Sequence, residues 1–348
     1  MLPTDRPALV LAPMQDITDL PFMRVMEHFG GPDLYVTEYF RVHRDSRLDP
    51  YILSSITENP SDKPILAQLI GQDLAALQRN ARELQNHPIA GIDLNLGCPA
   101  PVVCKKDAGG GLLRLPEKTE RILGTLREAC DQVPFTVKTR LGFHHHDEIN
   151  ALLGIFRKFD LDLLTIHGRT VQERYQTPIH PEKIRLAVET MPCPVIANGN
   201  VVNIPTGQAL LAQSGAAGLM VGRGAIRHPW IFSQLRAALS GQKIPAPTSR
   251  DLLHYIELLY EETARERQDF VAEKHVQKMK KYLIFIAQGH PQAFEHEVRR
   301  AQSPADFFAI CRRHLDHATP LPAFPPENSR LFCGFQELLT SADSSPTT

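Results

Sequence analysis

Residues 135–142 read FTVKTRLG, a short run of β-branched and apolar residues that ends in charged residues and a glycine. Other short apolar runs end in the same way, and helix-like segments separate them. They are LVLAPM (9–14), LYVTEY (34–39), ILAQLIG (65–71), GIDLNLG (91–97), LLTIHGR (163–169), PVIANGN (194–200) and GLMVGRG (218–224). Strands that alternate with helices predict a parallel sheet covered by helices, and eight strands are the number that closes a barrel.

We therefore predict the α/β class, with a (β/α)8 TIM barrel followed by a small all-helical domain. The chain has 348 residues, which fits one barrel and an appended domain. A doubly wound open sheet is the alternative. The G-x-G-x-x-G turn expected after the first strand of such a sheet is absent, which disfavours the open sheet relative to the barrel.

The sequence divides into three predicted regions. Residues 1–243 form the barrel, and GQKIPAPTS (241–249) is a Pro- and Gly-containing linker. Residues 250–318 carry apolar residues at helical spacing, which predicts a helical domain. Residues 319–348 are rich in Pro and Ser and are expected to be mostly disordered, apart from one packed helix in LFCGFQELL.

Composition restricts the partners. The formal net charge is −1, so any RNA contact must come from local patches of Lys and Arg. No apolar stretch is long enough to span a membrane, and the short apolar run near the N-terminus is interpreted as a strand. The six cysteines form no CxxC pair. We expect reduced thiols, a cytoplasmic monomer and no metal site.

The proposed strands end in residues that could take part in binding or catalysis. In a barrel of this type the active site lies at the C-terminal ends of the strands. Each such residue taken alone has an ordinary structural explanation, and it is the whole set that favours function. The set is Pro13 and Met14, Glu38, Gln68, Asn95 and Cys98, Lys138 and Arg140, His167, Asn198, Gly222 and Arg223.

Lys138 and Arg140 stand two apart in their strand, so their side chains face the same way, toward the barrel mouth. Burying two unpaired cations is costly, and we therefore expect an anionic or electron-rich ligand beside them. The alternative is a pair of internal salt bridges, with Glu38 or Asp93.

A thiol and a glycine-rich turn complete the predicted mouth. Cys98 follows a strand end in a Gly-Cys-Pro turn, upstream of AGGG (108–111), and this setting favours chemistry over packing. The NGN (198–200) and VGRG (221–224) turns follow the seventh and eighth strands, where barrels commonly bind phosphate. Arg223 can form a fork to such a phosphate.

Several ordered motifs resemble those of the tRNA-dihydrouridine synthases. They are LAPMQDITDLPF (11–22), AQLIG (67–71), DLNLGCP (93–99) with AGGGLL (108–113), VKTRLG (137–142), IHGRT (166–170), ANGN (197–200) and VGRGA (221–225). The resemblance spans roughly residues 8–235. VTEYFRVH (36–43) and HVQKMKKYL (275–283) resemble the bacterial branch that includes the synthase for position 16 of tRNA.

The resemblance implies FMN as a bound cofactor, NADPH as the reductant and tRNA as the substrate. The residues implied to contact the flavin ring are Pro13, Met14, Gln15, Gln68, Lys138 and His167. Those implied to hold its phosphate are Asn198, Gly199, Asn200, Gly222 and Arg223. Asn95, Arg140 and Tyr175 would bind the target uracil, and Cys98 would donate a proton. A second thiol nearby, Cys104, weakens the assignment to Cys98 alone.

The implied reaction is a hydride transfer to C6 of uracil and a proton transfer from Cys98 to C5. A cysteine with an ordinary pKa of about 8.5 is mostly protonated at neutral pH, as an acid should be. The uracil must leave its stack to reach the site. Alternatives are an FMN barrel acting on a free small molecule, similar to dihydroorotate dehydrogenase, and a catalytically silent tRNA-binding protein.

The helical region carries a candidate RNA surface. Lys274, Lys278 and Lys281 fall at helical spacing on one face, and a solvated face without function is the alternative. Arg299, Arg300, Arg312 and Arg313 form a second basic group. The orientation of this domain should select the uridine, at position 16 or, alternatively, at 17, 20 or 20a.

Overall fold

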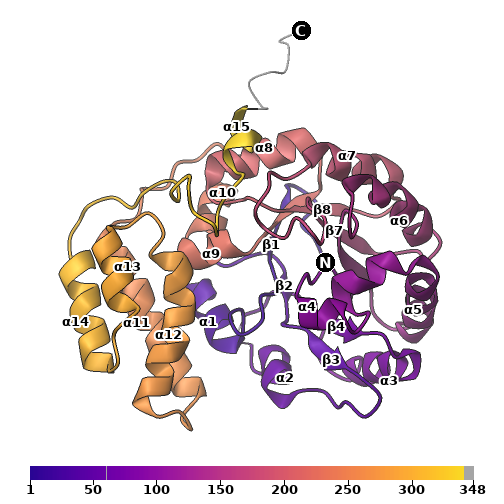
Figure 1. Cartoon of the computed structure of the whole chain (residues 1–348), viewed down its shortest axis with the longest axis horizontal. Coiled ribbons are helices and arrows are strands. Elements are labelled where there is room, and N and C mark those ends of the chain that lie inside the picture. The colour runs from indigo at the N-terminus through magenta and orange to yellow at the C-terminus, as the bar shows by residue number, and fades with distance from the viewer. Residues whose placement is uncertain (60, 341–348) are drawn as a thin grey trace.

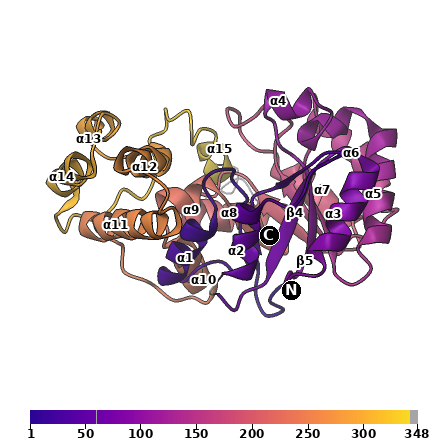
Figure 2. The ribbon, with the colours of Figure 1, turned by 90° about the horizontal axis from the view of Figure 1, so that it is seen from below.

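The computed structural model describes residues 1–59 and 61–340. A parallel sheet curls into a barrel, and a helical domain lies beside it (Figures 1 and 2). The strands are β1 (Ala8–Leu11), β2 (Tyr35–Val36), β3 (Phe40–Val42), β4 (Ile65–Gly71), β5 (Gly91–Leu96), β6 (Phe135–Arg140), β7 (Leu163–His167), β8 (Val195–Asn198) and β9 (Gly218–Val221).

Strand pairing confirms the predicted TIM barrel. The strands pair in the order β1-β9-β8-β7-β6-β5-β4-β2, all in parallel, and β3 also pairs with β4. A parallel bridge between Val10 and Leu34 joins the two ends of this order. The second predicted strand (34–39) contains only the short β2, and an unpredicted strand, β3, follows it; both lie along β4.

Helices surround the barrel in Figure 1. They are α1 (Leu20–His28), α2 (Pro50–Thr57), α3 (Leu74–Leu84), α4 (Pro101–Cys104), α5 (Pro116–Ala129), α6 (Ile149–Phe156), α7 (Pro181–Thr190), α8 (Ile204–Ser214), α9 (Arg223–Arg227) and α10 (Ile231–Leu239). Two 3₁₀ turns, η1 (Gly109–Arg114) and η2 (His146–Glu148), lie in the loops. Asp19, Asp49 and Asp73 cap α1, α2 and α3 by accepting backbone N–H groups.

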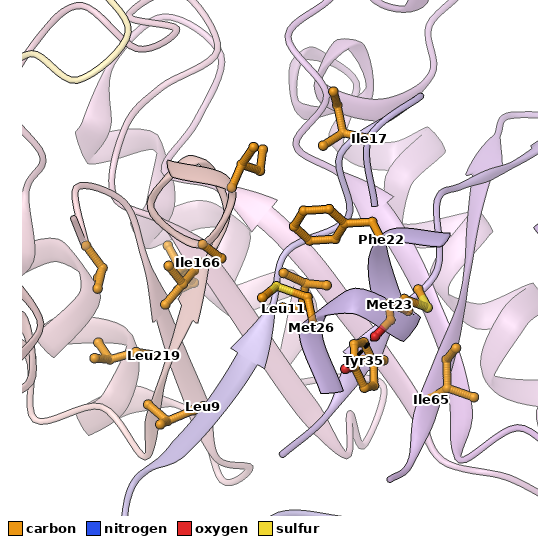
Figure 3. Close-up of a cluster of buried hydrophobic side chains, with 14 of the residues drawn as sticks. Leu9, Leu11, Ile17, Phe22, Met23, Met26, Tyr35, Ile65, Ile166 and Leu219 are labelled. Carbon is orange, nitrogen blue, oxygen red and sulfur yellow. Dashed lines mark hydrogen bonds between the residues drawn. The ribbon is translucent and has the colours of Figure 1, made fainter. Parts of the chain in front are cut away.

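Two apolar layers result from the alternation of side chains along each strand. Ala8 and Val10 of β1 point into the barrel and pack with Leu66, Leu163 and residues of other strands. The intervening residues of β1 pack outward against helix α1 (Figure 3). Apolar groups therefore fill the interior near the N-terminal ends of the strands, and polar side chains such as Gln68 and Asp93 lie between them and the mouth.

The helical domain consists of α11 (Ser249–Glu266), α12 (Ala272–Ile286), α13 (Gln292–Val298) and α14 (Pro304–Leu315). Its helix α11 packs against α1 of the barrel, and α12 packs against α9. The rings of Phe22 and Tyr282 stack with centroids 5.9 Å apart, and Tyr255 donates a 3.0 Å hydrogen bond to the carbonyl of Ile226. The domain thus shares a core with the barrel.

The C-terminal region differs from the expectation of disorder. Residues 319–340 run from α14 back across the barrel to α15 (Gln336–Thr340), which packs against α8 (Figure 1). Phe332, Phe335 and Leu338 are buried, and burial of such large apolar groups stabilises an ordered path. The SADSSPTT sequence (341–348), also expected to be disordered, lies outside the described residues.

Within the described part of the chain, each helix is too short or too polar to cross a membrane. The same residues contain no cluster of three or more His, Cys, Asp or Glu side chains arranged to hold a metal ion.

Candidate active site

A cavity of about 710 Å³ opens at the C-terminal ends of the strands. Loops after β1, β5, β6, β7, β8 and β9 line it, together with helix α12 and residues 330–332. The predicted residues on its wall are Pro13, Met14, Gln15, Asn95, Cys98, Lys138, Arg140, His167, Tyr175, Asn198, Gly199, Asn200, Gly222, Arg223 and Lys281. Gln68, Lys274 and Lys278 do not line it.

Gln68 is fully buried beneath the cavity, and both ends of its amide are used by neighbours. It donates to Asp93 Oδ2 at 2.7 Å and accepts from Asn95 Nδ2 at 2.8 Å. Asp93 in turn accepts from Thr136 at 2.6 Å, and burial raises the pKa of its carboxyl to about 6. Strand register therefore places Gln68 one layer deeper than Asn95 and Lys138, and its contact with a flavin ring stays a prediction.

Asn95 shapes the turn that presents Cys98. Its Oδ1 accepts the backbone N–H of Gly97 at 3.0 Å and of Cys98 at 2.9 Å. The glycine run packs directly behind this turn, because a Cβ on Gly110 would lie 2.9 Å from the Cys98 carbonyl oxygen. The thiol of Cys98 is consequently held at the cavity by a fixed backbone, and the glycines are required by close approach.

The second thiol has a different environment. Cys104 is buried and does not line the cavity, and its Sγ lies 3.4 Å from the carbonyl oxygen of Cys98. Burial raises the pKa of the Cys104 thiol. Cys104 therefore packs beneath the loop that carries Cys98.

Lys138 stands on the floor of the cavity. Its Nζ donates to Asn198 Oδ1 at 3.4 Å. Burial and the neighbouring Arg140 lower the pKa of the Lys138 ammonium to about 8, and Asp93 opposes that shift. An anion bound beside Lys138 would stabilise its charged form.

Arg140 donates to three backbone carbonyls. It donates to Gly97 O at 2.9 Å, to Thr170 O at 2.8 Å and to Arg174 O at 2.8 Å. Neither Glu38 nor Asp93 pairs with it or with Lys138 within the described residues, so the salt-bridge alternative is wrong. Arg140 joins the loops after β5 and β7, and its guanidinium lies 5.2 Å from the ring centroid of Tyr175.

His167 is buried at the end of β7 beside two arginines. Burial, with repulsion from Arg140 and Arg169, holds the pKa of its imidazole well below the usual range. The ring is therefore neutral at pH 7, and its Nε2 faces the Arg169 guanidinium at 3.3 Å. Sequence reasoning missed Arg169, although its spacing of two from His167 could have shown that both face the same side.

The NGN turn after β8 has a strained backbone. Gly199 and Asn200 adopt φ values of 128° and 55°, which favour glycine and asparagine. The Asn198 amide donates to Met220 O at 2.7 Å, and Asn200 Oδ1 accepts from Arg169 at 2.8 Å. These bonds hold the turn open toward the cavity.

The VGRG turn follows β9 on the same side. A Cβ on Gly222 would lie 3.1 Å from Met14 Sδ, and one on Gly224 would lie 2.2 Å from Val201 O. The backbone therefore approaches its neighbours closely here. Arg223 points toward Tyr175, with its guanidinium 4.6 Å from the ring centroid.

The cavity carries a concentration of positive charge. Lys138, Arg140 and Arg223 line it, and Arg169 lies buried beside it. None of these four forms an ion pair within 4 Å among the described residues. Burial and mutual repulsion lower the pKa of the Arg169 guanidinium to about 9. In addition, Gln15 Oε1 is buried on the wall with no hydrogen-bond partner in the described structure. The site thus fits a ligand that carries negative charge and N–H or O–H donors.

The helical-domain lysines do not form one free face. Lys278 Nζ pairs with Asp19 at 2.6 Å and is only 10% exposed, whereas Lys281 pairs with Asp16 at 3.1 Å near the cavity. Lys274 is exposed. Docking of α12 on the barrel thus engages Lys278 in an ion pair, and its role in contacting RNA stays a prediction. In the second basic group, Arg299, Arg312 and Arg313 each pair with a glutamate.

The fold and the site together define a class: a TIM-barrel enzyme with a cationic cavity and a thiol on the loop after β5. The chain belongs to the family described as Dihydrouridine synthase (Dus), which it matches over residues 10–319. This confirms the family that the motifs indicated.

Named relatives agree with that family. The chain is 31% identical over 314 residues to a "Probable tRNA-dihydrouridine synthase" of Rhodobacter capsulatus, covering 88% of this chain and 94% of that protein. It is 31% identical over 324 residues to "tRNA-dihydrouridine synthase B" of Xanthomonas axonopodis pv. citri, covering 89% and 93%. It is 30% identical over 320 residues to "tRNA-dihydrouridine(16) synthase" of Ralstonia nicotianae, covering 89% and 95%.

A solved 2-naphthoyl-CoA reductase shares the fold, with a TM-score of 0.54 at 10% identity over 68% of this chain and 50% of that one.

Proposed function

We propose that this enzyme uses bound FMN and NADPH to reduce the C5=C6 bond of a D-loop uridine in tRNA. The observation that carries the proposal is the position of Cys98 on the wall of a cavity whose floor holds Lys138. A proton donor and a buried cation are the two groups that such a reduction needs from the protein.

The cavity fits FMN in charge and in donor chemistry. Arg223, Asn200 and the glycines of the two turns would hold the phosphate, since loops after the last two strands of such barrels commonly do so. Lys138 and Gln15 would face the ring system, where Gln15 offers its unpartnered acceptor. FMN supplies the hydride when it is bound.

The protein's own groups then have separate tasks. Cys98 gives its proton to C5 of the uracil, and the fixed turn keeps its thiol at the cavity. Lys138 offsets negative charge beside it, because its ammonium is buried and lacks a carboxylate ion pair among the described residues. His167 stays neutral, so it can serve as a hydrogen-bonding group without adding charge.

The target base would enter between the barrel and the helical domain. Tyr175 is 39% exposed on the cavity wall, and an exposed ring can stack on a flipped base. Asn95 and Arg140 would border the base, although the side chains of both already hold backbone groups. Of the three α12 lysines in the predicted basic group, Lys274 and Lys281 are exposed and would contact the tRNA backbone.

The reduced uridine is proposed to be at position 16. VTEYFRVH and HVQKMKKYL support that position, and so does the name of the Ralstonia relative. The Xanthomonas relative, at similar identity, carries the name "synthase B" instead. Every uracil presents the same groups to the cavity, so position must depend on how the helical domain orients the tRNA.

The test begins with the purified protein. Heating should release a flavin with one phosphate, and the enzyme with NADPH should form dihydrouridine in unmodified tRNA. Mild alkali followed by reverse transcription maps the site by a stop at position 16. A stop only at 20 or 20a would overturn the position while leaving the reaction intact, and a colourless protein that takes up no FMN would overturn the cofactor.

The second candidate is an FMN enzyme acting on a free pyrimidine. The shared barrel is the only feature that favours this candidate, because the cavity chemistry would be the same for a free pyrimidine as for a tRNA uridine. Turnover on free uridine at the rate seen on tRNA would support this candidate over the first.

A further inference from the structure

Residues 329–335, here termed the C-terminal strap, cross the side of the cavity where β8 and β9 end. Arg223 Nη1 donates a hydrogen bond to the carbonyl oxygen of Leu331. The Arg223 guanidinium also lies 5.8 Å from the ring centroid of Phe332 and 4.6 Å from that of Tyr175. The strap therefore contacts Arg223 through both a carbonyl and an aromatic ring.

Two further donors of the barrel bind the same strap. Asn200 Nδ2 donates to the carbonyl oxygen of Gly334, and Arg169 Nη2 donates to that of Cys333 at 3.3 Å. A guanidinium has five N–H donors, so a strap carbonyl occupies only part of each arginine. The contacts fix the direction of these side chains. Arg223 lines the cavity and keeps other N–H donors for a ligand, whereas Arg169 is fully buried and also donates to Thr177 O and Asn200 Oδ1.

The strap is closely seated on the barrel. Gly334 has φ of +75°, and a Cβ there would lie 2.5 Å from the carbonyl oxygen of Thr177. The Phe335 ring stacks on Phe324 at 5.8 Å, and both Phe332 and Phe335 are buried with Val202. This seat leaves the strap little freedom to shift away from the cavity.

The strap also offsets part of the repulsion between buried arginines. Repulsion from Arg140 and Arg223 contributes to the lowered pKa of Arg169, and no carboxylate pairs with Arg169 or Arg223 among the described residues. Carbonyl dipoles directed at these cations offset part of the repulsion without supplying a full negative charge. The remaining positive charge is available to an anion in the cavity.

We infer that the strap is a positioning element of the cofactor site, which holds Arg223 and Asn200 in the orientation that receives the flavin phosphate. Arg169 supports this arrangement by donating to both Asn200 and the strap. The inference rests on the proposed function. The family match covers residues 10–319, and the strap lies after it.

The test compares two flavins that differ only in the phosphate. The full chain and a chain ending at Asn328 are stripped of flavin and titrated with FMN and with riboflavin, and binding is followed by quenching of flavin fluorescence. Loss of an oriented charge-assisted hydrogen bond should raise the Kd for FMN about tenfold or more, whereas the Kd for riboflavin should change less than about threefold.

Two controls accompany the shortened chain. A chain ending at Thr340 keeps the strap and should bind both flavins as the full chain does. Gly334→Ala disturbs the seat without removing residues, and Gly241→Ala is its match, because Gly241 has a similar φ of +70° but no atom within 4 Å of an added Cβ. Only Gly334→Ala should weaken FMN selectively, which keeps the test valid if the shortened chain fails to fold.

The possible outcomes separate the strap from the proposed function. Equal weakening of FMN and riboflavin, unchanged FMN binding or tighter FMN binding would each overturn the positioning role while the full chain still binds FMN. A full chain that binds neither flavin would overturn the proposed function and, with it, the role of the strap.

Discussion

Lys278 Nζ lies 2.6 Å from Asp19 Oδ2, and the two side chains are only 10% and 2% exposed. Asp19 also accepts hydrogen bonds from Tyr51 at 2.8 Å and from Tyr282 at 3.4 Å. Lys278 and Tyr282 belong to α12, whereas Asp19 caps α1 next to the loop that lines the cavity. This ion pair therefore joins the helical domain to the wall of the active site.

Breaking this pair should destabilise the protein and misalign the tRNA. Lys278→Met leaves a buried carboxylate without its cation, and we expect the free energy of unfolding to fall by about 3 kcal/mol. Turnover on tRNA should fall while the flavin content stays near that of the wild type. Urea denaturation measures the first effect, and Lys274→Met on the same helix should change stability by less than about 0.5 kcal/mol. Equal stability of the two variants would contradict the role of the pair.

Cys98→Ala should separate flavin reduction from uridine reduction. The variant should bind FMN and oxidise NADPH as the wild type does, because the thiol is needed only for the proton at C5. Dihydrouridine formation should fall by about 10²–10⁴-fold, the usual loss for a general acid. Cys104→Ala is the matched control. Wild-type turnover by Cys98→Ala together with loss in Cys104→Ala would show that the other thiol is the acid.

Lys138→Met should make the bound flavin harder to reduce. The buried ammonium favours a negatively charged neighbour, so its loss should lower the two-electron midpoint potential by about 30–60 mV, equivalent to roughly 1.5–3 kcal/mol. Spectroscopic titration against a reference dye measures this potential. Lys118→Met removes the same charge from a position outside the cavity lining and should leave the midpoint potential unchanged. An unchanged potential in Lys138→Met would place the flavin elsewhere.

Glu38 should make stability depend on pH. Burial and the nearby Asp19 raise the pKa of its carboxyl from 4.5 to about 8. The native state then holds a proton that the unfolded state releases, so this group lowers stability as pH rises from about 4.5 to 8. Glu38→Gln stays neutral and should gain about 1–3 kcal/mol relative to the wild type between pH 5 and pH 8. Denaturant unfolding at both values tests this, and a constant difference between the two proteins would refute it.

Much of the barrel could be predicted from the sequence because strand periodicity and the polar ends of the strands are local patterns. Lys138 and Asn198 lie near the C-terminal ends of their strands, and Cys98 and Arg223 follow theirs. Parallel strands bring such ends to one edge. The two-residue spacing of Lys138 and Arg140 likewise gave their common direction.

The same patterns could not predict which groups each of these side chains contacts. Arg140 and Lys138 occupy equivalent alternate positions of one strand, so the sequence pattern treats them alike. In the structure Arg140 donates to backbone carbonyls, whereas Lys138 has no carboxylate ion pair among the described residues. Gln68 also follows the strand-end pattern, yet it lies beneath the cavity lining, because its depth depends on the stagger between β4 and β5.

By itself, the sequence of this protein determined the barrel, the helical domain, the family and the loop that carries Cys98, since each depends on periodicity or on contiguous motifs. Only the tertiary structure decided that Lys278 pairs with Asp19 and that the strap reaches Arg223, contacts separated by 259 and 108 positions along the chain. Contacts between distant segments depend on packing and burial, which a local pattern does not encode.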